Sequence, residues 1–263
     1  MKLHRILALV NRHLMLYKRS PQRLMEIVYW PLLDLMVWGF ITMYLARYKE
    51  GLPAFVTFFL GALILWDILF RAQQGICISF LEEIWSRNLL NLFVSPLRTG
   101  EFLAATMTVS IIKVIGAAIM TIGLAYFLYS FNLFMIGLSL VPFVINLVVT
   151  GWAIGIFTTA IILRYGQEAE VLAWGLAFLF QPVSAVFYPI SVLPPWLQTI
   201  ANGIPAAHVF EGMRAVIETA NFPLTELLWA AGLNVLYLAG AILFFNGMFR
   251  IVKAKGLLVR VGE

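Results

Sequence analysis

Residues 133–163, LFMIGLSLVPFVINLVVTGWAIGIFTTAIIL, decide the fold class of this protein. The stretch contains no charged residue. It also exceeds the ~20 residues that an α-helix needs to cross the hydrocarbon core of a bilayer. A backbone surrounded by lipid has to satisfy its own hydrogen bonds, which favours a helix. The stretch therefore predicts a membrane-spanning helix.

The rest of the chain shares this character, since its composition is 62% hydrophobic and only 12% charged, with a mean hydropathy of +0.92. A soluble domain carries about 25% charged residues. We therefore expect an all-α membrane protein with six transmembrane helices, folded as a single transmembrane domain over 1–263. The other five predicted spans lie at 27–46, 54–77, 103–129, 171–191 and 224–250.

The distribution of Lys and Arg predicts that both termini are cytoplasmic. With the N-terminus inside, the inner segments are 1–26, 82–102, 164–170 and the tail from 250, and they hold six, two, one and four basic residues. The outer segments hold Arg47, Lys49 and Arg214. This excess of basic residues on the inner side follows the positive-inside rule. It also accounts for the net charge of +5 without nucleic acid as a partner.

Three segments outside the spans have patterns of their own. Residues 1–26 combine an apolar helical face with basic residues, which predicts an amphipathic helix at the membrane interface. Residues 82–102 predict a cytoplasmic helix from Glu82 to Phe93, with Arg87 near its start. Residues 192–222 predict two short helices between spans five and six, which form a re-entrant or an interfacial pair in the outer leaflet.

Ionisable residues inside predicted spans are costly in lipid and therefore informative. Asp34 lies in span one, Asp67 and Arg71 in span two, and Lys113 in span three. Asp67 and Arg71 are spaced i, i+4 and can pair on one helix face. Two interpretations remain open: the pair neutralises two buried charges, or these residues line a polar path. Asp34 must face another helix, a cavity or a subunit interface.

Span five carries prolines at Pro182 and Pro189, each of which removes an amide donor and kinks a helix. Phe187, Tyr188 and Trp196 lie close to the second proline. These aromatic residues could form a hydrophobic plug or an ordinary interfacial belt.

No enzyme site is expected. The chain contains no G-x-x-x-x-G-K-[ST] motif, so a phosphate-binding loop must lie on another polypeptide if ATP drives this protein. The histidines His4, His13 and His208 are dispersed and Cys77 is the one cysteine, so neither a metal site nor a catalytic histidine is predicted.

Two stretches carry a family resemblance. The inner loop at 86–98, SRNLLNLFVSPLR, and the outer stretch at 187–205, FYPISVLPPWLQTIANGIP, resemble the ABC-2 type permeases, as does the segment from His208 to Arg214 that follows. The resemblance covers nearly the whole chain. It is closer to drug, antibiotic or nodulation-type exporters than to the polysaccharide branch.

The resemblance implies a permease dimer that sits on two ATP-binding subunits in the bacterial inner membrane, with ATP and Mg on those partners and no cofactor in this chain. It implies export of a hydrophobic or amphipathic cargo such as a drug, a lipid-linked compound or a glycolipid. It also assigns roles to residues. Coupling to the ATPase falls to the 82–102 region, with Glu82, Glu83 and Arg87 as docking candidates. The extracytoplasmic gate falls to 192–222 with Phe187, Tyr188, Pro189 and Trp196, and the path to Asp34, Asp67 and Arg71.

Two other classes of protein compete with this interpretation. A secondary transporter or channel without an ATPase partner would predict inverted repeats and paired broken helices in both halves. The sequence offers a kinked span only in its second half. An integral-membrane lipid enzyme would require a cluster of His, Asp or Glu near one interface, and the sequence shows no such cluster.

Overall fold

The computed structural model describes residues 1–46, 53–219 and 221–256, and these residues form helices joined by short connections. Arg47, Lys49 and Arg260, which entered the charge count above, lie outside the described residues. The helices in chain order are α1 (Leu3–Lys18), α2 (Pro21–Ala46), α3 (Pro53–Trp85), α4 (Leu89–Val94), α5 (Thr99–Tyr129), η1 (Leu133–Ser139), α6 (Leu140–Tyr165), η2 (Gly166–Ala169), α7 (Leu172–Val183), η3 (Ile190–Val192), α8 (Pro195–Asn202), α9 (Pro205–Thr219) and α10 (Leu224–Ala254).

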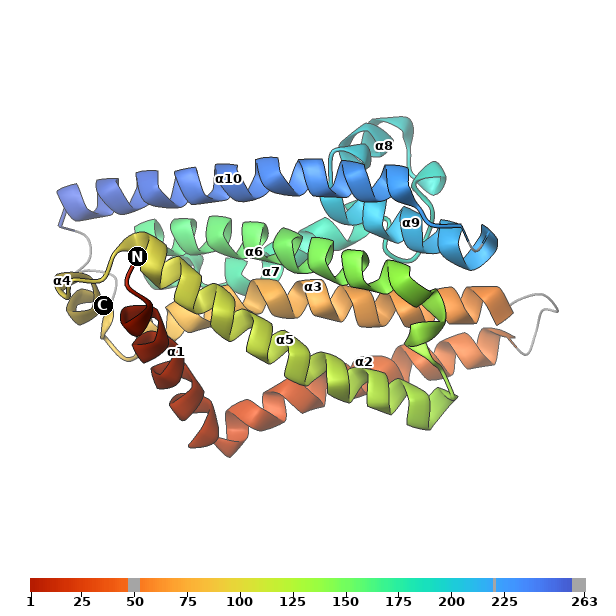
Figure 1. Cartoon of the computed structure of the whole chain (residues 1–263), viewed down its shortest axis with the longest axis horizontal. Helices are drawn as coiled ribbons and strands as arrows, with labels where there is room; N and C mark the ends of the chain where they lie inside the picture. Colours follow the sequence, from red (N-terminus) through yellow and green to blue (C-terminus); the bar gives the residue numbers. More distant parts are fainter. Residues whose placement is uncertain (47–52, 220, 257–263) are drawn as a thin grey trace.

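Five helical segments in the described residues are long and apolar enough to cross a membrane. They are Val28–Leu45, Val56–Trp85, Thr99–Tyr129, Leu133–Ala169 and Leu224–Ala254. Figure 1 shows them side by side as one elongated bundle. The predicted all-helical, multi-pass membrane architecture is therefore confirmed, and four of the predicted spans agree closely with these segments.

The predicted fifth span, 171–191, does not form one long helix. Within it α7 has 12 residues, which is about 18 Å and shorter than the ~30 Å hydrocarbon core. Pro182 lies in the last turn of α7, and turns and η3 follow it. The expectation of six full-length spanning helices is thus not confirmed, because this passage is a short helix continued by irregular chain.

The predicted second span, 54–77, is longer than expected, since α3 continues to Trp85. Polar side chains in its second half find partners on other helices. Gln73 and Gln74 both donate to the carbonyl oxygen of Ala173 in α7, at 2.9 and 2.5 Å. Such hydrogen bonds allow polar residues to remain inside a membrane helix.

Small residues bring α3 and α6 into close contact. A Cβ atom added at Gly151 would lie 2.5 Å from the carbonyl oxygen of Leu69, and one at Gly155 would lie 2.9 Å from that of Gln73. No larger residue fits without separating the helices. On its other side α6 contacts α10, where Asn234 donates to Asn146 at 2.9 Å and accepts from Thr150 at 2.8 Å. These contacts make α6 the central link of the bundle.

The predicted helix from Glu82 to Phe93 is in fact two helices. Glu82 and Glu83 belong to the last turn of α3, and α4 begins only at Leu89. Between them Arg87 adopts the left-handed conformation with φ of 53°. A left-handed residue directly after a helix is a common way of ending it. The expectation of one continuous helix was therefore wrong.

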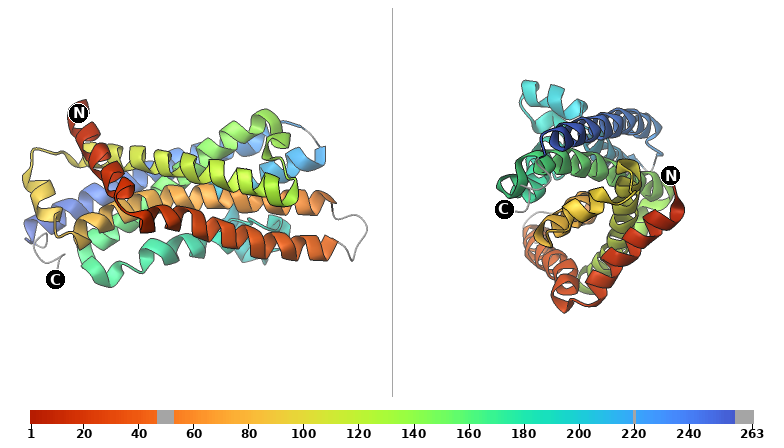
Figure 2. Two further views of the ribbon diagram at one scale, coloured as in Figure 1. Left: turned by 90° about the horizontal axis from the view of Figure 1, so that it is seen from below. Right: turned by 90° about the vertical axis from the view of Figure 1, so that its left-hand side faces the viewer.

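The two ends of the bundle differ. Figure 1 shows α1 and α4 at one end and α8 and α9 toward the other, and Figure 2 shows α1 lying obliquely to the long helices. Two helices, α8 and α9, lie within the 192–222 region. At the end that carries α4, the Phe93 ring packs 4.7 Å from the Phe249 ring of α10. Midway along α10, Tyr237 donates to the carbonyl oxygen of Gly203, directly after α8, at 2.9 Å.

Candidate translocation and coupling sites

A cavity of about 260 Å³ lies between α2, α3 and α7, three helices that run next to one another in Figure 2. We call it the intramembrane cavity. Its lining includes Asp34, Asp67, Arg71 and Phe187, four residues that the sequence had singled out separately. The structure therefore brings the predicted ionisable residues of spans one and two to a single site and adds one residue of the predicted gate.

Asp67 and Arg71 form the ion pair that their spacing predicts. Arg71 Nε donates to Asp67 Oδ1 at 3.1 Å, and both side chains are largely buried. Asp34 lines the same cavity from α2. Within the described residues, no hydrogen bond or ion pair to Asp34 is observed. Formally the cavity holds two carboxylates and one guanidinium, so its net charge is negative when both acids are ionised.

Contacts with α5 hold α2 in this position. Tyr129 near the end of α5 donates its hydroxyl to the carbonyl oxygen of Leu35 at 2.7 Å, directly beside Asp34. A Cβ atom at Gly39 would lie 2.3 Å from the Tyr129 ring. Glycine at this position is thus what lets the tyrosine reach α2, and the contact helps to position Asp34.

Aromatic side chains form much of the remaining cavity wall. Trp30 and Trp38 come from α2 and Trp66 from α3. Phe187 closes one side, stacked on Phe59 with ring centroids 4.9 Å apart. Large aromatic surfaces next to carboxylates suit a ligand with both apolar and charged parts.

The segment 184–190 around Phe187 is held by α9. Arg214 donates to the carbonyl oxygens of Ala185 and Tyr188, the second at 2.5 Å, and pairs with Glu211 at 2.9 Å. Glu211 also accepts from the backbone N–H of Ile190 at 2.6 Å. Sequence reasoning did not identify this pair as a site. The signal in the sequence was the i, i+3 spacing of Glu211 and Arg214, two opposite charges in a segment that is otherwise largely apolar.

The other predicted gate residues lie outside the cavity wall. Tyr188 donates its hydroxyl to the carbonyl oxygen of Pro182 at 2.6 Å, which joins the segment back to α7. Trp196 in α8 is 66% exposed and does not line the cavity. Pro189 precedes η3 in an extended conformation. Of the four predicted gate residues, only Phe187 contributes to the cavity.

A second site lies where α1 crosses the ends of α3 and α5. Glu83 is fully buried and accepts from Arg12 with both carboxylate oxygens at 2.6 Å. Asn88 donates to Glu83 at 2.8 Å. The buried Glu82 lies 3.1 Å from Nδ1 of the buried His13 and 3.2 Å from Arg23. We call these residues the α1 cluster; they fasten α1 and the start of α2 to the end of α3.

A third carboxylate extends this anchoring to α5. Glu101 is buried in the first turn of α5 and accepts from the backbone N–H groups of Lys2 at 2.7 Å and Arg98 at 3.0 Å. Arg5 lies 3.4 Å from the same carboxylate. Sequence reasoning missed Arg12, His13 and Glu101. The available signal was the excess of basic residues in 1–26 opposite three carboxylates in 82–102.

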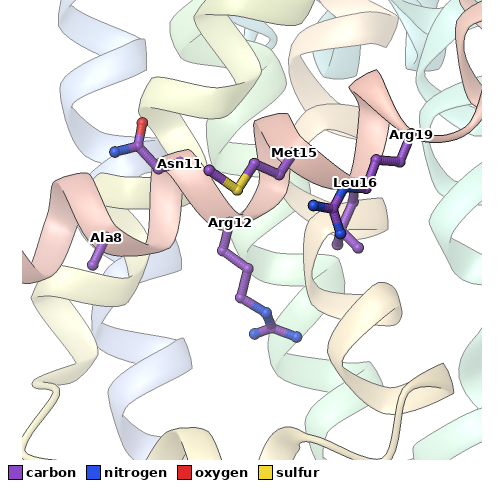
Figure 3. Close-up of a pocket in the computed structure, with 6 residues that line it drawn as sticks. All are labelled: Ala8, Asn11, Arg12, Met15, Leu16 and Arg19. Atoms are coloured by element: carbon purple, nitrogen blue, oxygen red, sulfur yellow. The ribbon is translucent and has the colours of Figure 1, made fainter.

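Two pockets lie against α1. Figure 3 shows the side chains that line a pocket on α1: Ala8, Asn11, Arg12, Met15, Leu16 and Arg19. A second pocket lies between α1 and residues 92–97. Of the three predicted docking residues, Arg87 is exposed beside this region, whereas Glu82 and Glu83 are covered. In the part of the chain that the structure describes, no group of His, Cys, Asp or Glu is placed to hold a metal ion.

These features together define a multi-pass helical membrane protein with a cavity between α2, α3 and α7 and a separate charged cluster at one end. Comparison with family models gives a match to the ABC-2 type transporter over residues 4–217, and the chain belongs to that family. The family is the membrane component of ABC transporters; it is generally not catalytic and generally partners with ATP-binding cassette subunits. No curated protein matches the chain.

Proposed function

We propose that this chain is the permease subunit of an ATP-driven exporter in the bacterial inner membrane, with both termini cytoplasmic. Two copies form the translocation path and assemble with two separate ATP-binding subunits. The single observation that carries this proposal is the family match over residues 4–217. The absence of a P-loop motif from the sequence assigns ATP and Mg to the partner. The drug, antibiotic and nodulation-type branch remains our assignment from the inner-loop and outer-segment motifs.

Coupling is proposed to act through α1, α4 and the end of α3. Arg87 and α4 offer the exposed surface on which an ATP-binding subunit can dock. Glu82 and Glu83 do not contact the ATP-binding subunit in this scheme, because they are buried; they connect α3 to α1 instead. A displacement of α4 is then passed to α1 and α3 together. Separating a buried carboxylate from its basic partner costs much free energy. The ion pairs of the α1 cluster therefore favour a movement in which α1 and the end of α3 stay together.

The intramembrane cavity is proposed to form part of the path, with Phe187 at its boundary toward the 192–222 region. The Arg214–Glu211 pair holds the segment that carries Phe187, and release of those hydrogen bonds is the proposed opening step. The cargo is expected to be hydrophobic or amphipathic, such as a drug, a lipid-linked compound or a glycolipid. The aromatic lining of the cavity supports this class.

The proposal is tested by reconstitution in lipid with candidate ATP-binding subunits, chosen from genes adjacent to the one that encodes this chain. We expect stable co-purification and vanadate-sensitive ATPase activity that the permease stimulates. A triple variant, Arg87→Ala with Leu90→Ala and Asn91→Ala, alters only exposed residues at the α3–α4 junction and should weaken co-purification. Glu168→Gln on the exposed part of η2 is the matched control. Transport by the chain alone, without any ATPase, would instead support the alternative of a secondary transporter or channel.

A further inference from the structure

We propose that the intramembrane cavity selects organic cations, and that the cargo carries a quaternary ammonium or similar cationic group attached to an apolar body. The inference rests on the proposed transport function and adds the charge of the substrate to it. It follows from three properties of the cavity: its charge, its aromatic wall and its size.

The charge favours a cation. Asp67 is neutralised by Arg71 at 3.1 Å, whereas Asp34 lines the same cavity and forms no ion pair or hydrogen bond within the described residues. Asp34 shares the single positive charge of Arg71 with Asp67, and ionisable residues in membrane spans are costly, so a positive ligand beside Asp34 lowers the free energy of the site. Arg71 carries one positive charge and therefore cannot neutralise both Asp67 and Asp34.

The wall favours a soft, weakly hydrated cation over a metal ion. Trp30, Trp38 and Trp66 line the cavity together with Phe70, Phe178 and Phe187. The face of an indole ring attracts a cation, and clusters of aromatic rings with a nearby carboxylate are the usual receptors for quaternary ammonium groups. A metal ion would instead need several oxygen ligands, and no group of acidic or histidine side chains in the described residues is arranged for one.

The size of about 260 Å³ fits a compact ring or a small cationic head group, but not a whole glycolipid. The cavity sits on the outer side of α2, where Asp34, Trp30 and Trp38 are exposed in the single chain. A ligand can therefore enter sideways from the lipid or from between two permease copies. A lipid-soluble cation reaches such a site without crossing water.

The test uses a pair of compounds of the same shape and different charge. Benzyltrimethylammonium is cationic, and neopentylbenzene is its neutral counterpart. Radiolabelled benzyltrimethylammonium is bound to the purified chain in nanodiscs of zwitterionic lipid at pH 8. We expect saturable binding that unlabelled benzyltrimethylammonium displaces and an equal concentration of neopentylbenzene does not. Equal displacement by the neutral compound, or no saturable binding, would overturn the proposal.

Variants connect the binding to individual residues. Asp34→Asn keeps the side-chain shape and should weaken binding about tenfold or more, whereas Arg71→Gln removes the competing positive charge and should tighten it. Glu168→Gln, on the exposed part of η2, is the control for removal of a carboxylate elsewhere. A purely structural role of Asp34 and Arg71 predicts weaker binding in both variants, so opposite shifts separate the two explanations. Unchanged affinity in Asp34→Asn refutes the assignment even if Arg71→Gln does not fold.

Failure of this inference and failure of the proposed transport function can be told apart, because binding to the permease alone needs no ATPase. Cation binding without any ATPase stimulation in the reconstituted complex would support the cation site and refute the proposed exporter function. ATPase stimulation by neutral compounds, with no cation binding, would leave the exporter and remove the inference drawn here about charge.

Discussion

Glu83→Gln tests whether the α1 cluster holds α1 against the bundle. Glu83 is fully buried and its carboxylate receives both short contacts from Arg12, with Asn88 as a further donor. The amide of Gln offers one acceptor oxygen in place of two and carries no charge. Hydrogen bonds to charged groups contribute about 1.5–3 kcal/mol, and the exposure of Arg12 argues for the lower part of that range.

A loss of about 2 kcal/mol in the docking of α1 raises the population of undocked helix about 30-fold, since about 1.4 kcal/mol corresponds to a factor of ten. A buried reporter in α1 can measure this population. Leu9 is 6% exposed and packs in the cluster of buried residues beneath α1. Leu9→Cys in a Cys77→Ala background provides one thiol whose reaction rate with a maleimide follows the undocked fraction.

We therefore expect Glu83→Gln to accelerate modification at position 9 about 30-fold, and Glu168→Gln in the same background to leave the rate unchanged. The measurement is made on the purified chain in nanodiscs, with size-exclusion chromatography to show that both variants remain folded. If Glu83→Gln reacted no faster than the control, the α1 cluster would not be what holds α1, and the coupling scheme built on it would fail.

Three further changes probe other contacts. Gly151→Ala forces α3 and α6 apart and should lower the free energy of unfolding by about 1–3 kcal/mol. Gly116→Ala is the control, because its Cβ position has open space, and it should be neutral or stabilising. Thermal unfolding in detergent compares the two variants, and equal melting temperatures would refute the close contact. Asn234→Leu breaks the α6–α10 hydrogen bonds and should lower the melting temperature by about 2–4 °C for a loss of about 1 kcal/mol, so an unchanged value would contradict their role. Arg214→Gln removes the hydrogen bonds to the carbonyl groups of Ala185 and Tyr188, so the 184–190 segment should open more often and its backbone amide hydrogens should exchange about tenfold faster. Exchange as slow as in the parent protein would show that Arg214 does not hold the segment.

The sequence predicted those features that depend on local pattern. Long uncharged stretches such as 133–163 gave spans, because length and hydropathy alone decide whether a helix suits a bilayer. The i, i+4 spacing of Asp67 and Arg71 gave their ion pair, because a helix places those positions side by side. The cost of charge in lipid singled out Asp34, which the structure places on the wall of the intramembrane cavity.

The features that escaped prediction depend on contacts between distant parts of the chain. The prolines at 182 and 189 indicated a kink after α7, but not that Arg214 and Glu211, more than twenty residues away, bind the backbone groups of this passage. Glu82 and Glu83 looked like an exposed helix start because nothing local reveals that α1 folds back over them. A hydropathy pattern predicts that charged residues at a helix end are solvated. It carries no information about partners that lie about seventy residues away in the chain, as Arg12 and His13 do here.

The long helix α10 touches both ends of the bundle. Near its C-terminal end Phe249 packs on Phe93 of α4. At its middle Tyr237 donates to the carbonyl oxygen of Gly203 after α8, and in its first turn Glu226 lies 2.6 Å from Nδ1 of His208 in α9. Its 31 residues extend about 46 Å without a break. A rigid rod of that length moves its far end about 4 Å when it tilts by about 5°. Such a shift exceeds the length of a hydrogen bond, so α10 cannot swing at α4 without breaking or carrying along the α8–α9 connection.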